Sequence, residues 1–141
     1  MTRDPGNVFK IATVDSRVRR YLTAHGWEFR GRGEEMEMDA YRERKTGKLL
    51  SLEDISEDFP VTFLMGELSL VAFRKIAHDL TPKVRLLEVE SSWEGRPTTI
   101  VVSMTEDQVR SMFGERTKMK RLQIQRVTKL NANARAKSSG Q

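Results

Sequence analysis

The chain has 141 residues, of which 38% are hydrophobic and 32% charged, and it contains no cysteine. This length fits one domain plus a tail, and the apolar fraction is too high for a fully disordered chain. The lack of cysteine excludes disulfides, zinc–thiolate sites and cysteine nucleophiles. No stretch has the length and apolarity of a signal peptide or a membrane span, so we expect a cytoplasmic protein (or a nuclear one in a eukaryote) with no membrane partner.

Positive charge is concentrated at the C-terminal end of the chain. The net charge is +5, and the stretch from residue 116 to the end holds eight basic residues and no acid. Residues 1–115 then hold 17 basic and 20 acidic residues, a net charge of −3. Such segregation favours an anionic partner for the C-terminal arm, and the alternative is a tail that only increases solubility.

The N-terminal part is expected to combine one helix with a strand hairpin. Apolar residues recur at i, i+3 and i+4, which is typical of an amphipathic helix. The segment begins with a small polar residue that can cap the helix and ends at a glycine. Polar and apolar residues then alternate on both sides of a glycine turn, as in a half-buried hairpin. The expected elements are a flexible N-terminus at 1–7, an apolar lead-in at Val8–Ile11, a helix capped by Thr13 or Asp15 that ends at His25–Gly26, and strands at Trp27–Arg30 and Met36–Arg42.

The central segment is expected to supply the main helix. Ser51–Asp54 has the pattern of a capping box, which predicts the start of a short helix. Pro60 suits a first helical turn, and two apolar stripes then indicate one long helix from Val61 to Leu80. A helix that is apolar on most faces belongs in the middle of a core or at an oligomer interface.

The C-terminal part is expected to hold a hairpin, a helix and a last strand. The strands are predicted at Val84–Glu90 and Thr98–Met104, and Thr105–Gln108 forms a second capping box for a helix that ends at Gly114. A final strand is expected over Arg121–Val127, before a disordered basic tail at 131–141.

Together these elements predict a single α+β domain over residues 8–130. We expect an antiparallel sheet built from two hairpins plus a C-terminal strand, packed against one long central helix and two or three short helices.

Catalytic and metal-binding patterns are not evident in the sequence. His25 is expected at a helix C-terminus, where a cation suits the dipole, and His78 has no second ligand at helical spacing. The acidic residues of 34–39 share an exposed strand face without converging on a point. The glycines do not form a phosphate-binding loop. We therefore expect no enzyme activity, no metal and no cofactor, with a Ser/His/Asp arrangement as the open alternative.

Two sets of residues are candidate binding sites. Trp93 and Arg96 lie at the tip of the second hairpin, where the indole either folds over the sheet edge or faces a partner. The basic strand and arm would contact the phosphate backbone of RNA or DNA. The residues expected to make those contacts are Arg121, Arg126, Lys129, Arg135 and Lys137.

The run Tyr41–Asp54 resembles a strand–turn–capped-helix piece of many small bacterial and phage proteins, which favours a prokaryotic or phage accessory protein. The long apolar helix and the methionines Met36 and Met38 favour adaptable contacts with another protein or with a second copy. Our first hypothesis is therefore a non-enzymatic protein-binding module or oligomer subunit. The alternative is a nucleic-acid-binding protein that uses the basic arm.

Overall fold

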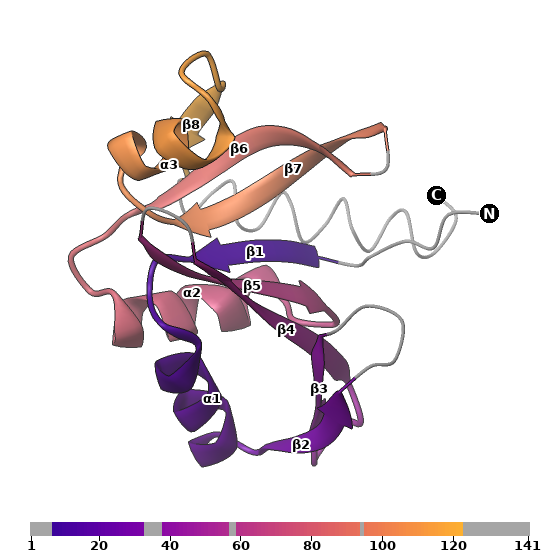
Figure 1. The fold of residues 1–141 in the computed structure, drawn as a ribbon. Helices are drawn as coiled ribbons and strands as arrows, with labels where there is room; N and C mark the ends of the chain where they lie inside the picture. Colours follow the sequence, from indigo (N-terminus) through magenta and orange to yellow (C-terminus); the bar gives the residue numbers. More distant parts are fainter. Residues whose placement is uncertain (1–6, 33–37, 57–58, 94, 123–141) are drawn as a thin grey trace.

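The structure is a computed structural model that describes residues 7–32, 38–56, 59–93 and 95–122. In this part of the chain, eight strands form one sheet and three helices pack on it (Figure 1). The elements are β1 (Asn7–Ile11), α1 (Asp15–Ala24), β2 (Trp27–Arg32), β3 (Asp39–Glu43), β4 (Leu49–Ser56), β5 (Pro60–Gly66), α2 (Leu70–Leu80), β6 (Leu86–Trp93), β7 (Arg96–Ser103), α3 (Glu106–Phe113) and β8 (Met119–Arg121).

The sheet is mixed, so the predicted antiparallel architecture is wrong. Its strand order is β2-β3-β4-β5-β1-β7-β6-β8, with β1 antiparallel to β5 and parallel to β7. β1 covers Val8–Ile11, the segment expected to be only a lead-in, and it joins the two antiparallel halves of the sheet. The pairing of Phe9 with Val101 links residues far apart in the sequence, which no local pattern can reveal.

Helices cover both faces of the sheet. Phe9 and Ile11 of β1 pack in one apolar cluster with residues of α1 and α2, whereas Val8 belongs to a second cluster that includes Val109 of α3. Because successive strand residues point to opposite faces, α1 and α2 lie on one face and α3 on the other. Strands β2 to β4 curve the sheet back toward α1 (Figure 1).

The long helix predicted over Val61–Leu80 is wrong. Its first part is strand β5, and only Leu70–Leu80 is helical. Residues Val61–Met65 are all buried, because β5 lies inside the sheet with apolar side chains on both faces. A strand buried on both faces reads as a continuous apolar run and is easily taken for a helix. Gly66 separates the two elements with a φ of +143°, and Ser69 caps α2 by accepting a bond from the Ala72 amide.

The helix expected after Ser51 is also a strand, but for a different reason. Leu50 and Leu52 are buried on β4, with the more exposed Ser51 and Glu53 between them, and β4 pairs along its whole length with β5. The capping-box pattern Ser51–Asp54 therefore lies within a ladder, where tertiary pairing overrides the local signal. Met38, expected at a surface, is only 4% exposed, and Met36 lies outside the described residues.

Two other predictions are confirmed. β6 and β7 form the expected antiparallel hairpin, paired from Leu86 with Ser103 to Trp93 with Arg96. Thr105 and Gln108 make both bonds of the capping box that opens α3. The last strand, β8, begins two residues before the predicted start.

None of the helices in the described ranges has the length and apolarity needed to cross a membrane.

Candidate functional site

The predicted phosphate contacts begin at the end of β8. Arg121 is the last residue of this strand and is exposed. Its neighbour Lys120 lies 3.6 Å from the buried carboxylate of Glu88, so that cation is partly neutralised within the chain. Arg121 makes no ion pair with any carboxylate of the described residues. The other predicted contacts, Arg126, Lys129, Arg135 and Lys137, lie outside the described residues.

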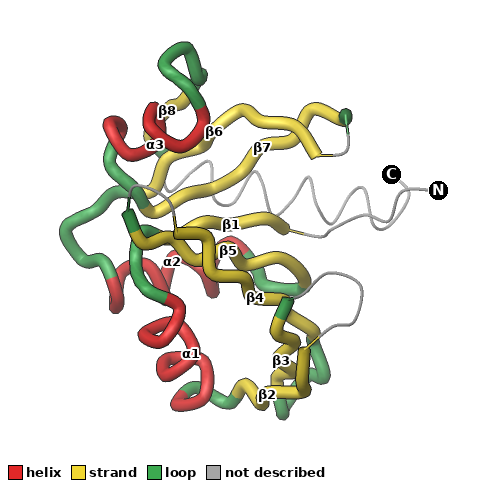
Figure 2. The backbone as a smooth tube through the Cα atoms, viewed as in Figure 1, coloured by secondary structure: helices red, strands yellow, loops and turns green. Residues whose placement is uncertain are grey.

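Two of the basic residues of the described part occupy opposite edges of the sheet. Arg30 is exposed on the edge strand β2, whereas Arg17 and Arg20 are exposed on α1, where Arg17 donates to the Leu80 carbonyl at the end of α2. Arg121 lies on β8, the other edge strand (Figure 2). Nucleic-acid binding by all of these residues would need them on one surface. Arg30 and Arg121 do not share one, because the other strands of the sheet lie between β2 and β8.

The hairpin tip predicted as a partner site is formed by the last pair of the β6–β7 ladder. Trp93 and Arg96 are cross-strand partners, and Arg96 is exposed. The side chain of Trp93 falls outside the described part, so its predicted role stays a prediction.

The two histidines lie on the surface of helices. His25 follows the last residue of α1, where its ring stacks on Tyr21 with the centroids 3.9 Å apart. His78 is exposed on α2. In the described residues, no three His, Asp or Glu side chains are grouped so as to hold a metal ion.

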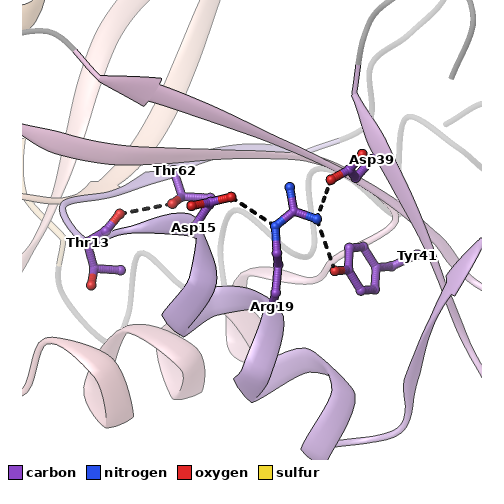
Figure 3. A network of polar contacts seen from close by, with 6 residues as sticks. All are labelled: Thr13, Asp15, Arg19, Asp39, Tyr41 and Thr62. Atoms are coloured by element: carbon purple, nitrogen blue, oxygen red, sulfur yellow. Dashed lines mark hydrogen bonds and ion pairs between the residues drawn. The ribbon is translucent and has the colours of Figure 1, made fainter. Parts of the chain in front are cut away.

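A polar network fixes α1 against the sheet (Figure 3). The Arg19 guanidinium binds Asp15 one turn earlier, with Nε and Oδ2 2.9 Å apart. It also forms an ion pair with the carboxylate of Asp39 and donates a hydrogen bond to the Tyr41 hydroxyl at 3.4 Å. Burial by itself would lower the pKa of Arg19, but the bonds to Asp15, Asp39 and Tyr41 outweigh it and raise that pKa. The guanidinium therefore stays charged and ties α1 to β3.

A second contact joins α1 to α2. The Tyr21 hydroxyl donates to Asp79 Oδ2 at 2.7 Å. Burial and this hydrogen bond raise the pKa of Tyr21 to about 12, because both favour the neutral phenol over the phenolate. Together with the Arg19 network, this bond holds α1 in place behind the edge strand β2.

The strand β2 has an open edge. It pairs with β3 alone among the described strands and ends the strand order. The Arg44 amide donates to the Gly26 carbonyl, which makes the adjacent Trp27–Glu43 pair non-hydrogen-bonded. Hydrogen-bonded and non-hydrogen-bonded pairs alternate along an antiparallel ladder, so the Phe29–Tyr41 pair is also of the second kind. The N–H and C=O of Phe29 therefore point away from β3, toward the open edge.

Phe29 adds an apolar side chain to this edge. It is 56% exposed and is the only aromatic among the exposed large apolar side chains of the described residues, the others being Val14, Leu49 and Val71. Its ring meets Tyr41 edge-on at 5.6 Å, so one side of the ring is supported by the sheet. An exposed aromatic on an edge strand is a combination that suits strand addition by a partner.

Sequence reasoning predicted the strand at Trp27–Arg30 but not its position at the edge of the sheet. The alternation of Trp27 and Phe29 is typical of a strand with one buried face. Trp27 is buried beneath α1, whereas Phe29 is exposed. The edge position could have been inferred from the charged residues Glu28 and Arg30 and from Gly31, which follows them. Charges and glycine are typical of edge strands.

Comparisons with protein-family models, curated proteins and solved structures find no match to this chain. The open edge of β2 and the residues that line it are therefore the candidate functional site.

Proposed function

We propose that this chain is a small non-enzymatic binding protein that engages another protein through the open edge of β2. The single observation that carries the proposal is Phe29, an exposed aromatic whose backbone N–H and C=O also point to that open edge. A cytoplasmic location and a role as a prokaryotic or phage accessory protein belong to the same proposal.

The physical basis is strand addition. An extended segment of a partner lying along β2 would satisfy the outward N–H and C=O groups of Trp27 and Phe29, which gives affinity without depending on the partner's sequence. The Phe29 ring would supply the apolar anchor, because aromatic side chains bury a large area and lose little conformational entropy. The rigid attachment of α1 through Arg19 and Tyr21 keeps the strand preorganised.

The test is affinity capture with the immobilised full chain and two matched variants. We expect Phe29→Asp to abolish retention of partner proteins, because it places a charge where the apolar anchor would bind. Val71→Asp is the control, since Val71 is 58% exposed on α2, away from β2. The proposal fails if both variants recover the same partners as the wild type.

A second candidate function is phosphate-backbone binding by the basic C-terminal region. Its support is the exposed Arg121 together with Arg116 and Lys118, none of which makes an ion pair with a described carboxylate. We expect deletion of residues 129–141, which removes Lys129, Arg135 and Lys137, to weaken RNA or DNA binding and to reduce its dependence on salt. An affinity that does not change with salt concentration would exclude this candidate.

A further inference from the structure

We infer that the partner of β2 is a second copy of this chain, with the two β2 strands antiparallel across a twofold axis at Phe29. This inference rests on the proposed function and names the occupant of the same edge. In this arrangement Phe29 lies opposite Phe29 of the second copy, and the two sheets continue into one.

The backbone of β2 is compatible with this pairing. Because Phe29 directs its N–H and C=O outward, two facing copies of Phe29 can exchange both hydrogen bonds about the axis. The two pairs beside it join Glu28 of one copy to Arg30 of the other and follow the normal alternation of an antiparallel ladder. Beyond them the bulge ends the ladder, because Gly31 faces Ala40 and directs its polar groups to β3.

The charges of β2 are self-complementary in this register. Glu28 and Arg30 flank Phe29, so the twofold axis places each Glu28 opposite Arg30 of the other copy. Glu28 is the cross-strand partner of Arg42, and the bulge in β2 places Arg30 and Gly31 opposite Ala40. Since Arg42 and Ala40 are two residues apart on β3, the side chains of Glu28 and Arg30 belong to the same face of the sheet. Facing residues of a non-hydrogen-bonded pair are the closer kind, which suits an ion pair.

Neighbouring registers are disfavoured by the same charges. A shift of the axis by one residue toward the N-terminus places Glu28 opposite Glu28, and a shift by one residue toward the C-terminus places Arg30 opposite Arg30. Like charges directly opposite each other destabilise a strand pair. The charges that protect an edge against unspecific pairing thus disfavour both registers adjacent to the one centred on Phe29.

The groups that this register needs are available. Arg44 Nε lies 2.7 Å from Glu28 Oε1, which fixes the carboxylate and leaves its other oxygen for a partner. The side chain of Glu28 is 42% exposed. Arg30 is exposed and makes no ion pair with a carboxylate of the described residues. Since the paired segment is short, we expect an interface of less than about 1,200 Å² and therefore a concentration-dependent dimer.

A cysteine crosslink tests the inference directly, because the chain has no cysteine of its own. Cα atoms of a hydrogen-bonded pair are about 5.5 Å apart, which lies within the range that a disulfide spans. We expect Phe29→Cys to form a covalent dimer rapidly under mild oxidation. Leu49→Cys is the control, since Leu49 is 55% exposed but lies on β4, and it should crosslink only slowly.

A charge exchange provides the second readout, by sedimentation equilibrium. We expect Glu28→Arg and Arg30→Glu each to weaken the dimer about tenfold or more, because each sets two like-charge pairs across the axis, and the double variant to restore it. Folding of each variant is checked by its circular dichroism spectrum.

The inference is overturned if the wild type is monomeric at every concentration, or if both cysteine variants crosslink at the same rate. If capture of other proteins still depends on Phe29 in that case, the proposed function stands and only self-pairing is wrong. If capture also fails to depend on Phe29, both are wrong.

Discussion

Replacing Gly66 by alanine tests the break between β5 and α2. At this position a Cβ atom would lie 2.6 Å from the Leu49 carbonyl oxygen and 3.1 Å from the Leu50 Cα, both of them backbone atoms that cannot rotate away. The φ of +143° adds a conformational cost for any L-residue. We expect the conformational cost to be about 1–2 kcal/mol and the displacement of β4 to cost about 1–3 kcal/mol more.

Gly95→Ala is the matched control for this prediction. Gly95 also has a positive φ, +79°, but nothing lies within 4 Å of the place that its new Cβ atom would occupy, so only the conformational cost applies. Any gain from restricting the unfolded chain is shared by both variants and cancels. Urea unfolding should show Gly66→Ala to be the less stable variant by about 1–3 kcal/mol. Equal stabilities would refute the close packing of β5 on β4.

The network around α1 yields two further predictions. In urea titrations, Arg19→Met should lower the free energy of unfolding by about 1–3 kcal/mol, because it leaves two partly buried carboxylates without their cation. Arg20→Met, at an exposed site, is the control and should change that free energy by less than about 0.5 kcal/mol. Equal effects of the two substitutions would contradict the network. The raised pKa of Tyr21 means that its contribution to stability is complete below the unfolded value of about 10 and is lost as the pH rises through about 12. In a Tyr41→Phe background, where Tyr21 is the one tyrosine left, tyrosinate absorbance should therefore appear with a midpoint near pH 12. Adding Asp79→Asn should move this midpoint back toward about pH 10. A midpoint near about pH 10 with Asp79 in place would exclude the Tyr21–Asp79 bond.

Local signals in the sequence were sufficient for part of the fold. The β6–β7 hairpin combines β-branched residues with a polar tip, and the capping box of α3 satisfies its first amides within four residues, so neither depends on distant contacts. The helix α1 was also expected near its observed place, although Val14 occupies its N-cap position without a side-chain bond.

The errors at β5 and β1 have one cause, which is burial on both faces of the sheet. β5 and β1 lie at the centre of the sheet, where apolar residues face α1 and α2 on one side and the second apolar cluster on the other. Their alternation is lost, and the period that distinguishes a strand from a helix is lost with it. The parallel pairing of β1 with β7, which determines the sheet order, connects residues about ninety positions apart and leaves no local trace.

The same limit applies to the candidate site. Trp27 and Phe29 share one face of β2 and both are aromatic, yet α1 covers the first and leaves the second exposed. The sequence therefore predicted the strand and its charged neighbours, but the open edge became evident only from the sheet order. The basic residues Arg30 and Arg121 are both exposed, and their separation to opposite edges follows from the same order.

Amide hydrogen exchange at Phe29, measured by NMR over a series of protein concentrations, tests the central claim most directly. The account predicts that in dilute solution this amide exchanges rapidly although it belongs to a strand, and that exchange slows as the concentration rises, while the Arg42 amide, which faces β2 within the ladder, stays protected throughout. Protection of Phe29 that is already complete at the lowest concentration would show that its N–H has a partner within the chain, and rapid exchange at every concentration would show that no second copy binds there.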